Sequence, residues 1–240
     1  MYSIETRQLT KKFKEKVAVD GINLQIKKGE LFALLGTNGA GKTTTIKMLS
    51  GLTLPTSGDI EIENMDMKKD IFKIKEILNV SPQETAIAPN LTVKENLEFM
   101  AGVYQISNKE KKIDELIKQF KLEEILNKRT KTLSGGWQRR LSIAISLINN
   151  PKILFLDEPT LGLDVIARKE LWKVINELKG KITIILTTHY MEEAESLSDR
   201  IGIMANGKLV DVGTSEDLIK KTKTNNFEDA FVSIATGGEL

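Results

Sequence analysis

The chain has 240 residues, with 35 lysines and arginines against 33 aspartates and glutamates and a formal net charge of +2. Its charge balance therefore favours neither a nucleic acid nor an acidic partner. It contains no cysteine, which excludes a disulfide framework and thiolate chemistry and fits a reducing cytoplasm. The length suits one domain, with or without an inserted lobe. Because no apolar run approaches the ~18 residues of a membrane-spanning helix, we expect a chain that does not cross a membrane.

The N-terminal part predicts strand, loop and helix in succession. The stretch GINLQIKKGELFALLG has strand character on both sides of a Lys-Lys-Gly-Glu turn. Its last part, Leu31 to Leu35, is continuously apolar and leads directly into a glycine-rich loop. Helical spacing then follows with Ile46, Leu49 and Leu52. A strand, a loop and a helix in this order form the context that a phosphate-binding loop requires.

The loop GTNGAGKT matches the phosphate-binding pattern G-x-x-x-x-G-K-[ST]. Its glycines allow the backbone to wrap a phosphate without Cβ clashes, so that successive N–H groups converge on it. The Lys42 ammonium neutralises the β- and γ-phosphates, and the Thr43 hydroxyl is a ligand for Mg²⁺. The alternative is a glycine-rich turn that only joins a strand to a helix. We expect ATP contacts along the whole loop: Gly36, Thr37, Asn38, Gly39, Ala40, Gly41, Lys42, Thr43 and Thr44.

Residues 84–150 predict an α-helical lobe inserted into an α/β region. Thr92 and Glu95 have the spacing of a capping box, and apolar residues recur at helical intervals after them. A second amphipathic segment spans Ile113 to Leu126. A third follows the sequence LSGG and places on one face Trp137, Leu141, Ala144, Ile145 and Ile148.

Ser134, Gly135 and Gly136 form a second candidate phosphate site at the start of this third helix. A helix start has free backbone N–H groups, and the helix dipole favours an anion there. One chain would then contain two phosphate elements that lie far apart in the sequence.

Two acidic residues follow the apolar run ILFL. Ligands of α/β sheets bind at the carboxyl ends of the strands, where Asp157 can hold Mg²⁺ through water. The next side chain, Glu158, points elsewhere and is placed to activate an attacking water as general base. The alternative is an acidic turn that caps a strand, and the phosphate-binding loop favours the catalytic interpretation over it.

Three further residues are candidates by position. His189, the only histidine, ends the strand ITIILTTH, and a parallel sheet would bring it near Asp157 and a γ-phosphate. Its alternative is a core or surface histidine. Gln83 marks the passage into the helical lobe, where a contact with the γ-phosphate or Mg²⁺ would couple the two parts. Phe13 either stacks on adenine or packs at a strand edge.

Strands and helices alternate again after residue 150, which implies a parallel sheet covered on both faces. The sequence therefore predicts an α/β fold with a mainly parallel core, an N-terminal antiparallel β region and an inserted α-helical lobe. We expect a single domain over residues 1–240. Its nucleotide-binding core would comprise residues 1–83 and 151–215, its helical lobe residues 84–150, and its polar helical tail residues 216–240.

The order of the motifs GxxxxGK[ST], Gln83, LSGGW, ILFLDEP, LGLD and His189 resembles that of the ATP-binding subunits of ABC transporters, over nearly the whole chain. The resemblance implies a P-loop NTPase of the ABC cassette type that hydrolyses ATP. The implied Mg²⁺ ligands are Thr43, Gln83 and, through water, Asp157.

The resemblance also implies a function for the second candidate phosphate site, Ser134–Gly136. In that family, the segment Ser134–Gly136 closes over the nucleotide held by the P-loop of a second copy or of a paralogous cassette. Gly162 and Asp164 of LGLD would run along the seam between the two subunits, and Phe13 takes the position of the family's aromatic residue against adenine. Two residues depart from the usual pattern, namely Trp137 and Leu161, but neither removes a charged group from the site.

The sequence from Glu158 to the C-terminus resembles exporter ATPases of the drug-resistance and sodium-extrusion type. This resemblance implies a cytoplasmic subunit, peripheral on the membrane, beneath a separately encoded polytopic membrane subunit that contacts residues 86–98, with no nucleic acid as partner. A soluble ABC-type ATPase of an assembly pathway is the alternative. A non-catalytic binding subunit is disfavoured because the four residues of the catalytic set are present, Lys42, Asp157, Glu158 and His189.

Overall fold

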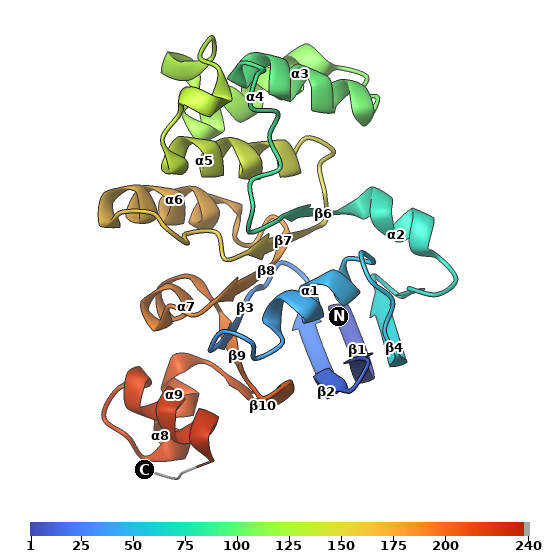
Figure 1. The fold of residues 1–240 in the computed structure, drawn as a ribbon, viewed down its shortest axis with the longest axis vertical. Coiled ribbons are helices and arrows are strands. Elements are labelled where there is room, and N and C mark those ends of the chain that lie inside the picture. Colours follow the sequence, from blue (N-terminus) through green and yellow to red (C-terminus); the bar gives the residue numbers. More distant parts are fainter. Residues whose placement is uncertain (238–240) are drawn as a thin grey trace.

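Two β-sheets enclose helix α1 in the computed structural model of the protein, which describes residues 1–237 (Figure 1). The larger sheet has the strand order β10-β9-β3-β8-β7-β6. The strands are β3 (Leu31–Gly36), β6 (Leu78–Ser81), β7 (Ile153–Asp157), β8 (Thr183–Thr188), β9 (Arg200–Ala205) and β10 (Lys208–Gly213). All neighbours in this sheet are parallel except β10, which is antiparallel to β9. The predicted mainly parallel core is confirmed.

The smaller sheet is the predicted N-terminal antiparallel region. Its order is β2-β1-β4-β5, with β1 (Tyr2–Phe13), β2 (Lys16–Lys27), β4 (Ser57–Ile62) and β5 (Met65–Asp66). The turn predicted before β3 exists, but the strands on its two sides belong to different sheets. Strand β1 was not predicted from its sequence, because its pairing with β2 shifts register several times and charged residues interrupt the alternation.

The two faces of the larger sheet bury different partners, because side chains alternate along each strand. Phe32, Leu34 and Phe155 face α1 (Lys42–Leu49) and the antiparallel sheet. Leu154 and Leu156 face the opposite way, toward α5 (Gly135–Ser146) and α6 (Val165–Leu178). Both faces are therefore covered, and a ligand of this sheet is expected at the carboxyl ends of the strands.

Most of residues 84–150 are helical and form the end of the molecule that contains α3, α4 and α5 (Figure 1). They are α3 (Val93–Val103), α4 (Lys109–Phe120) and α5, together with the 3₁₀ turns η1 (Glu123–Ile125) and η2 (Thr130–Thr132). The capping box of Thr92 and Glu95 is confirmed. The segment predicted to continue to Leu126 ends earlier, because Lys121 adopts a left-handed conformation that closes α4.

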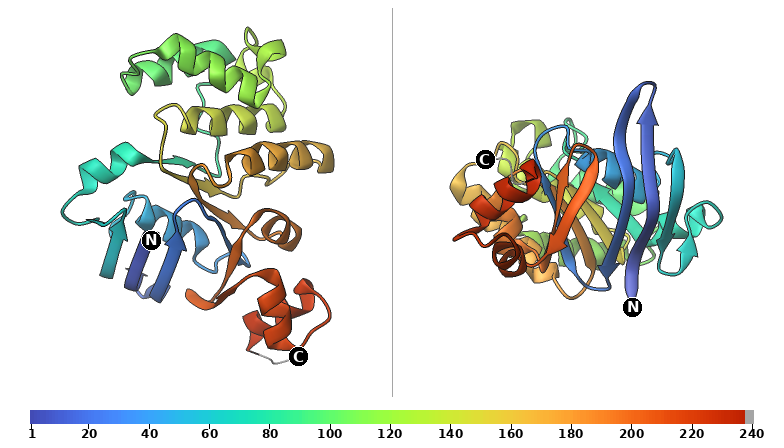
Figure 2. Two further views of the ribbon diagram at one scale, coloured as in Figure 1. Left: turned by 180° about the vertical axis from the view of Figure 1, so that it is seen from behind. Right: turned by 90° about the horizontal axis from the view of Figure 1, so that it is seen from below.

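Helix α2 (Ile71–Ile77) precedes β6, and α7 (Met191–Leu197) packs on the larger sheet between α6 and the tail, which contains α8 (Ser215–Thr222) and α9 (Phe227–Thr236). Figure 2 shows the tail helices at the opposite end from α3 and α4. The prediction of a polar appendage is wrong in one respect, since Leu218, Phe227 and Ile234 pack against β9. The predicted boundaries of core, lobe and tail stay predictions, and residues 238–240 of the tail lie outside the described residues. Within residues 1–237, no helix has the length and apolar character needed to cross a membrane.

Candidate functional site

The glycine-rich loop joins β3 to α1 at the centre of the larger sheet. Gly41, the N-cap of α1, has φ 104, a backbone conformation that favours glycine. A Cβ on Gly41 would lie 2.5 Å from the carbonyl oxygen of Ala18 on β2. The close approach of β2 and the positive φ therefore both require glycine here, and they hold the loop in a conformation that can wrap a phosphate.

Lys42 begins α1 and is 5% exposed. Its Nζ donates a hydrogen bond to the carbonyl oxygen of Gly36 at 2.8 Å and lies 3.2 Å from Glu158 Oε1. A buried ammonium needs such partners, because an isolated buried charge is very costly. Its cationic group is thereby held beside the loop, where it can neutralise a phosphate.

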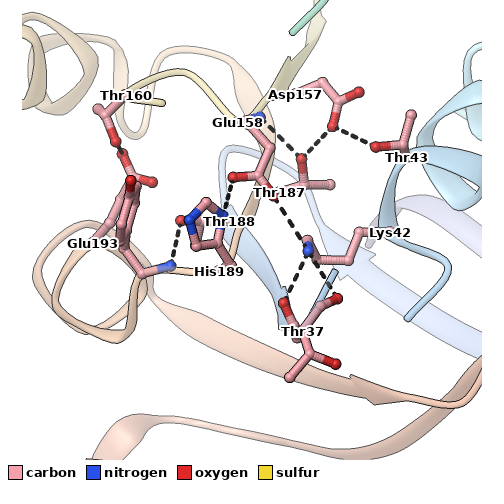
Figure 3. A network of polar contacts seen from close by, with 12 residues as sticks. Thr37, Lys42, Thr43, Asp157, Glu158, Thr160, Thr187, Thr188, His189 and Glu193 are labelled. Carbon is pink, nitrogen blue, oxygen red and sulfur yellow. Dashed lines mark hydrogen bonds and ion pairs between the residues drawn. The ribbon is translucent and has the colours of Figure 1, made fainter. Parts of the chain in front are cut away.

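Asp157, at the end of β7, is held by two hydroxyl groups. Thr43 Oγ1 donates to Asp157 Oδ1 at 3.0 Å, and Thr187 Oγ1, on the adjacent strand β8, donates to the same oxygen (Figure 3). A carboxylate beside a hydroxyl offers the hard oxygen ligands that Mg²⁺ prefers. These residues fit a Mg²⁺ ion bound with phosphate oxygens. The sequence pointed to Thr43 and Asp157 but assigned no role to Thr187.

Glu158 is 6% exposed, and its carboxylate lies between two cationic or protonatable groups. One oxygen pairs with Lys42, and the other lies 2.6 Å from His189 Nδ1 (Figure 3). Its backbone has φ 48, an uncommon left-handed conformation for a residue other than glycine. The turn after β7 therefore aims Asp157 at Thr43 and Glu158 at Lys42 and His189.

Glu193 of α7 lies behind this network and is fully buried. Its Oε1 accepts hydrogen bonds from Thr160 Oγ1 at 2.8 Å and from Trp172 Nε1 at 3.0 Å. Burial raises the pKa of Glu193 above its ordinary value, although these hydrogen bonds oppose the shift. The carboxyl thus connects the loop after Glu158, helix α6 and the segment that follows His189.

A cavity of about 500 Å³ lies over these groups. Predicted residues that line it are Phe13, Asn38, Gly39, Gly41, Lys42, Thr43, Thr44, Gln83, Glu158 and His189. Three residues that were not predicted also line it, namely Lys16, Ala18 and Leu161. Phe13 is 51% exposed, which leaves a flat apolar ring available to a ligand at this surface.

Three residues of the predicted loop do not line the cavity but support the residues that do. Ala40 is buried and packs in the core, whereas Thr37 and Gly36 provide carbonyl oxygens for Lys42 Nζ. The predicted roles of individual site residues stay predictions, but the larger sheet brings the P-loop, both acidic residues and the histidine to one place.

The segment Ser134–Gly136 does not line the cavity. Ser134 is the N-cap of α5, and its exposed side chain makes no capping hydrogen bond. Gly162 and Asp164, on the loop before α6, are also exposed. Asp164 caps α6 by accepting hydrogen bonds from the backbone N–H groups of Ile166 and Ala167, each at 2.9 Å.

The fold and this site define a P-loop nucleotide-binding cassette of the ABC type. Residues 19–161 match the family described as "ABC transporter". The linearmycin resistance ATP-binding protein LnrL of Bacillus subtilis (strain 168) is 39% identical over 221 residues, which cover 91% of this chain and 71% of LnrL. The chain therefore belongs to the ABC transporter family.

Longer relatives and solved structures agree with this assignment. The protein named probable multidrug ABC transporter ATP-binding protein YbhF of Escherichia coli (strain K12) is 42% identical over 96% of this chain, which spans only 41% of that protein. A solved ATP-binding subunit of an ABC transporter superposes with a TM-score of 0.85 at 28% identity, covering 96% of this chain and 98% of that one. A dimeric ATP-binding cassette in a post-hydrolysis state with ADP and Pi has a TM-score of 0.79 at 28% identity, covering 88% and 98%.

Proposed function

We propose that the chain hydrolyses ATP as the motor subunit of an ABC transporter and works as a head-to-tail dimer. Each ATP would lie between the P-loop of one copy and Ser134–Gly136 of a second copy or of a paralogous cassette. The observation that carries this proposal is the cavity itself. It joins the P-loop to Glu158 and His189 within one chain, whereas the exposed start of α5 lies outside it.

Within one copy, the side chains divide the work of phosphate cleavage. The Lys42 ammonium binds the β- and γ-phosphates, and Thr43, Asp157 through water, and Gln83 hold Mg²⁺. The bound ion supplies positive charge against the phosphate oxygens. Glu158 accepts the proton of the attacking water as general base.

The contact of His189 with Glu158 supports a role in orienting the carboxylate and in contacting the γ-phosphate. Phe13 stacks on the adenine, as its exposed position at the cavity supports. Gly162 and Asp164 lie along the seam, which their exposure near α6 supports. Closure around ATP and opening after hydrolysis would then convert chemical energy into movement.

We further propose that the dimer works on the cytoplasmic face of the membrane beneath a separately encoded polytopic subunit, in an exporter. The names of the relatives LnrL and YbhF, which refer to linearmycin resistance and multidrug transport, support export. The helical region after Gln83 would meet the membrane subunit through residues 86–98.

Replacement of the general base tests the hydrolysis step. Glu158→Gln should bind Mg-ATP but lose about 10²–10⁴-fold in hydrolysis rate, and it should accumulate as a closed dimer in light scattering. Glu192→Gln, which removes a surface carboxylate paired with Arg168, is the matched control. A Glu158→Gln chain that stays monomeric with saturating Mg-ATP, even with its membrane partner present, would contradict the sandwich.

The membrane partner is tested by purification from the native host. Tagged Glu158→Gln would be isolated from membranes solubilised in mild detergent with Mg-ATP. A polytopic membrane protein at equal copy number is the expected result. A soluble partner, or a dimer without membrane association, would contradict the transporter and favour an ATPase of an assembly pathway. The proposed nucleotide chemistry would not be affected.

A further inference from the structure

Arg139, in the second turn of α5, makes hydrogen bonds that reach far beyond its own helix. It is 4% exposed. Its Nε donates to the carbonyl oxygen of Pro159 at 2.8 Å, and its Nη2 donates to those of Asp157 and Glu158, the latter at 2.8 Å. Its Nη1 donates to the carbonyl oxygens of Pro82 and Gln83. Five backbone carbonyls thus accept from the five N–H groups that a guanidinium has.

These acceptors belong to the two loops that carry candidate catalytic groups. Pro82 and Gln83 follow β6, and the other three carbonyls form the turn that follows β7. Figure 1 shows α5 directly beside these two strands. One side chain of the helix capped by Ser134 therefore ties the backbone of Gln83 to the backbone of Glu158.

The turn that Arg139 contacts has an unfavourable conformation. Glu158 has φ 48, and such a backbone persists only where surrounding contacts fix it. The Glu158 N–H donates to the Thr187 carbonyl at 3.1 Å, while Arg139 holds its carbonyl and those of both neighbours. Without the guanidinium, each of these three carbonyls would lose a hydrogen bond, and that of Glu158 would keep the one from the Leu161 N–H at 3.2 Å. The backbone that aims the carboxylate at Lys42 and His189 would then be less firmly fixed.

The buried charge also has an electrostatic consequence. Burial lowers the pKa of Arg139 to about 10, although the negative charges of Asp157, Glu193 and Glu158 oppose the shift. The guanidinium stays charged at neutral pH, and its hydrogen bonds to carbonyls are charge-assisted. A shorter or neutral side chain at this position cannot reproduce all five bonds.

We propose that Arg139 is a positioning residue for ATP hydrolysis and links α5, the helix capped by Ser134, to the backbone of both Glu158 and Gln83. Contact of Ser134–Gly136 with a nucleotide at the start of α5 would then be transmitted to the general base and to the Mg²⁺-binding loop. This inference rests on the proposed role of Glu158 as general base.

The neighbouring Arg140 provides a matched control. It is 8% exposed, pairs with Glu170 on α6 and stacks over the ring of Trp137 at 4.7 Å. It is thus an arginine of the same helix and similarly buried, but its guanidinium hydrogen-bonds to Glu170 and not to the backbone of Glu158 or Gln83. Loss of Arg140 tests packing between helices without disturbing the turn after β7.

The test compares Arg139→Lys with Arg140→Lys by steady-state hydrolysis, nucleotide binding and thermal unfolding. Arg139→Lys should lower kcat by about 10-fold or more, as expected for a misplaced reacting group, while KM and the Kd for ATP change by less than about 3-fold. Arg140→Lys should leave kcat within about 2-fold. If Arg139→Lys does not fold, Arg139→Gln removes the buried charge, keeps two donors and is expected to show the same split between kcat and KM.

A second measurement distinguishes failure of this inference from failure of the proposed function. In the Glu158→Gln background, Arg139→Lys should cause a smaller further loss than in the wild type, because the part of its effect that acts through Glu158 is already removed. Unchanged kcat in folded Arg139 variants, or an equal loss in Arg140→Lys, would overturn the positioning role. If Glu158→Gln itself keeps hydrolysing ATP, the general-base assignment is wrong, and the inference falls with it.

Discussion

The P-loop and the segment Ser134–Gly136 both place glycines at the start of a helix, but the rest of the chain encloses only the P-loop. Around the P-loop, Ala18 of β2 approaches Gly41, and Lys42 lies between Gly36 and Glu158. At the start of α5, Ser134 and Gly135 are exposed, and a Cβ on Gly135 would meet only Leu163 at 3.9 Å. Residues of the same chain surround the P-loop, whereas the start of α5 is exposed.

This difference indicates why glycine is present at each place. In the P-loop, strain and close packing within the chain require it. In the second segment, the chain leaves room for a side chain at Gly135. If glycine is required there, the requirement would come from another molecule that approaches this surface. A second nucleotide-bearing copy is such a partner, and it is the occupant that the proposed function assigns.

The largest expected effect comes from the enclosed element. Lys42→Met removes the charge beside the phosphates, so we expect hydrolysis to fall by about 10²–10³-fold and ATP binding by a single chain to weaken with it. Fluorescent-nucleotide titration and phosphate release would measure both. Tight ATP binding by Lys42→Met would show that this lysine does not hold the phosphates.

The exposed element should respond differently. Ser134→Arg places a long side chain on the free surface, so one chain should bind ATP within about 2-fold of wild type. Hydrolysis should nevertheless fall about 10²-fold, since closure on the partner's nucleotide is blocked. The same titration and phosphate-release measurements apply. A proportionate loss of binding in the monomer would place Ser134 in its own chain's site instead.

Folding stability should sharpen the comparison. Gly41→Ala should destabilise the protein by more than about 1 kcal/mol, because its backbone and its neighbour both disfavour a Cβ. Gly135→Ala, on the exposed surface, should change stability by less than about 0.5 kcal/mol. Urea denaturation of both variants provides the measurement. Equal losses of unfolding free energy would contradict the proposed difference between the two glycines.

The smallest effect concerns Glu193, which belongs to the network beneath the enclosed element. Its pKa is raised by burial from an ordinary value of 4.5, so the folded protein holds this proton more tightly than the unfolded chain. The resulting stabilisation is complete below about pH 4.5 and is lost as pH rises through the folded pKa.

Glu193→Gln removes this dependence. The unfolding free energy of the wild type minus that of the variant should therefore decrease from about pH 4.5 toward pH 7. Urea denaturation at several pH values would measure this difference, in which the contributions of the other carboxyl groups cancel. A difference that does not change with pH would contradict protonation of the buried carboxyl.

Much of the enclosed site was predictable, because apolar strands without alternation predict parallel pairing. The pairing of Asp157 with Thr187 in adjacent strands follows from that pattern, and it brings Glu158 and His189 together. The P-loop was identified by its spacing together with the strand and the helix predicted on either side of it. Local sequence was sufficient wherever the contact lies at a strand end of the parallel sheet.

The role of Arg139 was not predictable from its own surroundings in the sequence. Two arginines in the middle of a helix are typical of a solvated face, and the apolar spacing of α5 gave it a single buried face. The helix is instead buried on most sides, because loops from Gln83 and Pro159, distant in sequence, fold over it. Such burial depends on tertiary contacts with distant segments, and the spacing of apolar residues along the helix does not predict them.

Cross-linking between copies tests the central claim most directly, and the absence of cysteine makes single thiols easy to place. Ser134→Cys and Asn38→Cys chains, each also carrying Glu158→Gln, would be mixed and treated with a short bismaleimide. We predict a covalent dimer in the mixture that depends on Mg-ATP, with little in either chain alone, because Ser134 of one copy meets the P-loop of the other. A mixture that yields no ATP-dependent dimer, while both chains bind ATP, would contradict the sandwich.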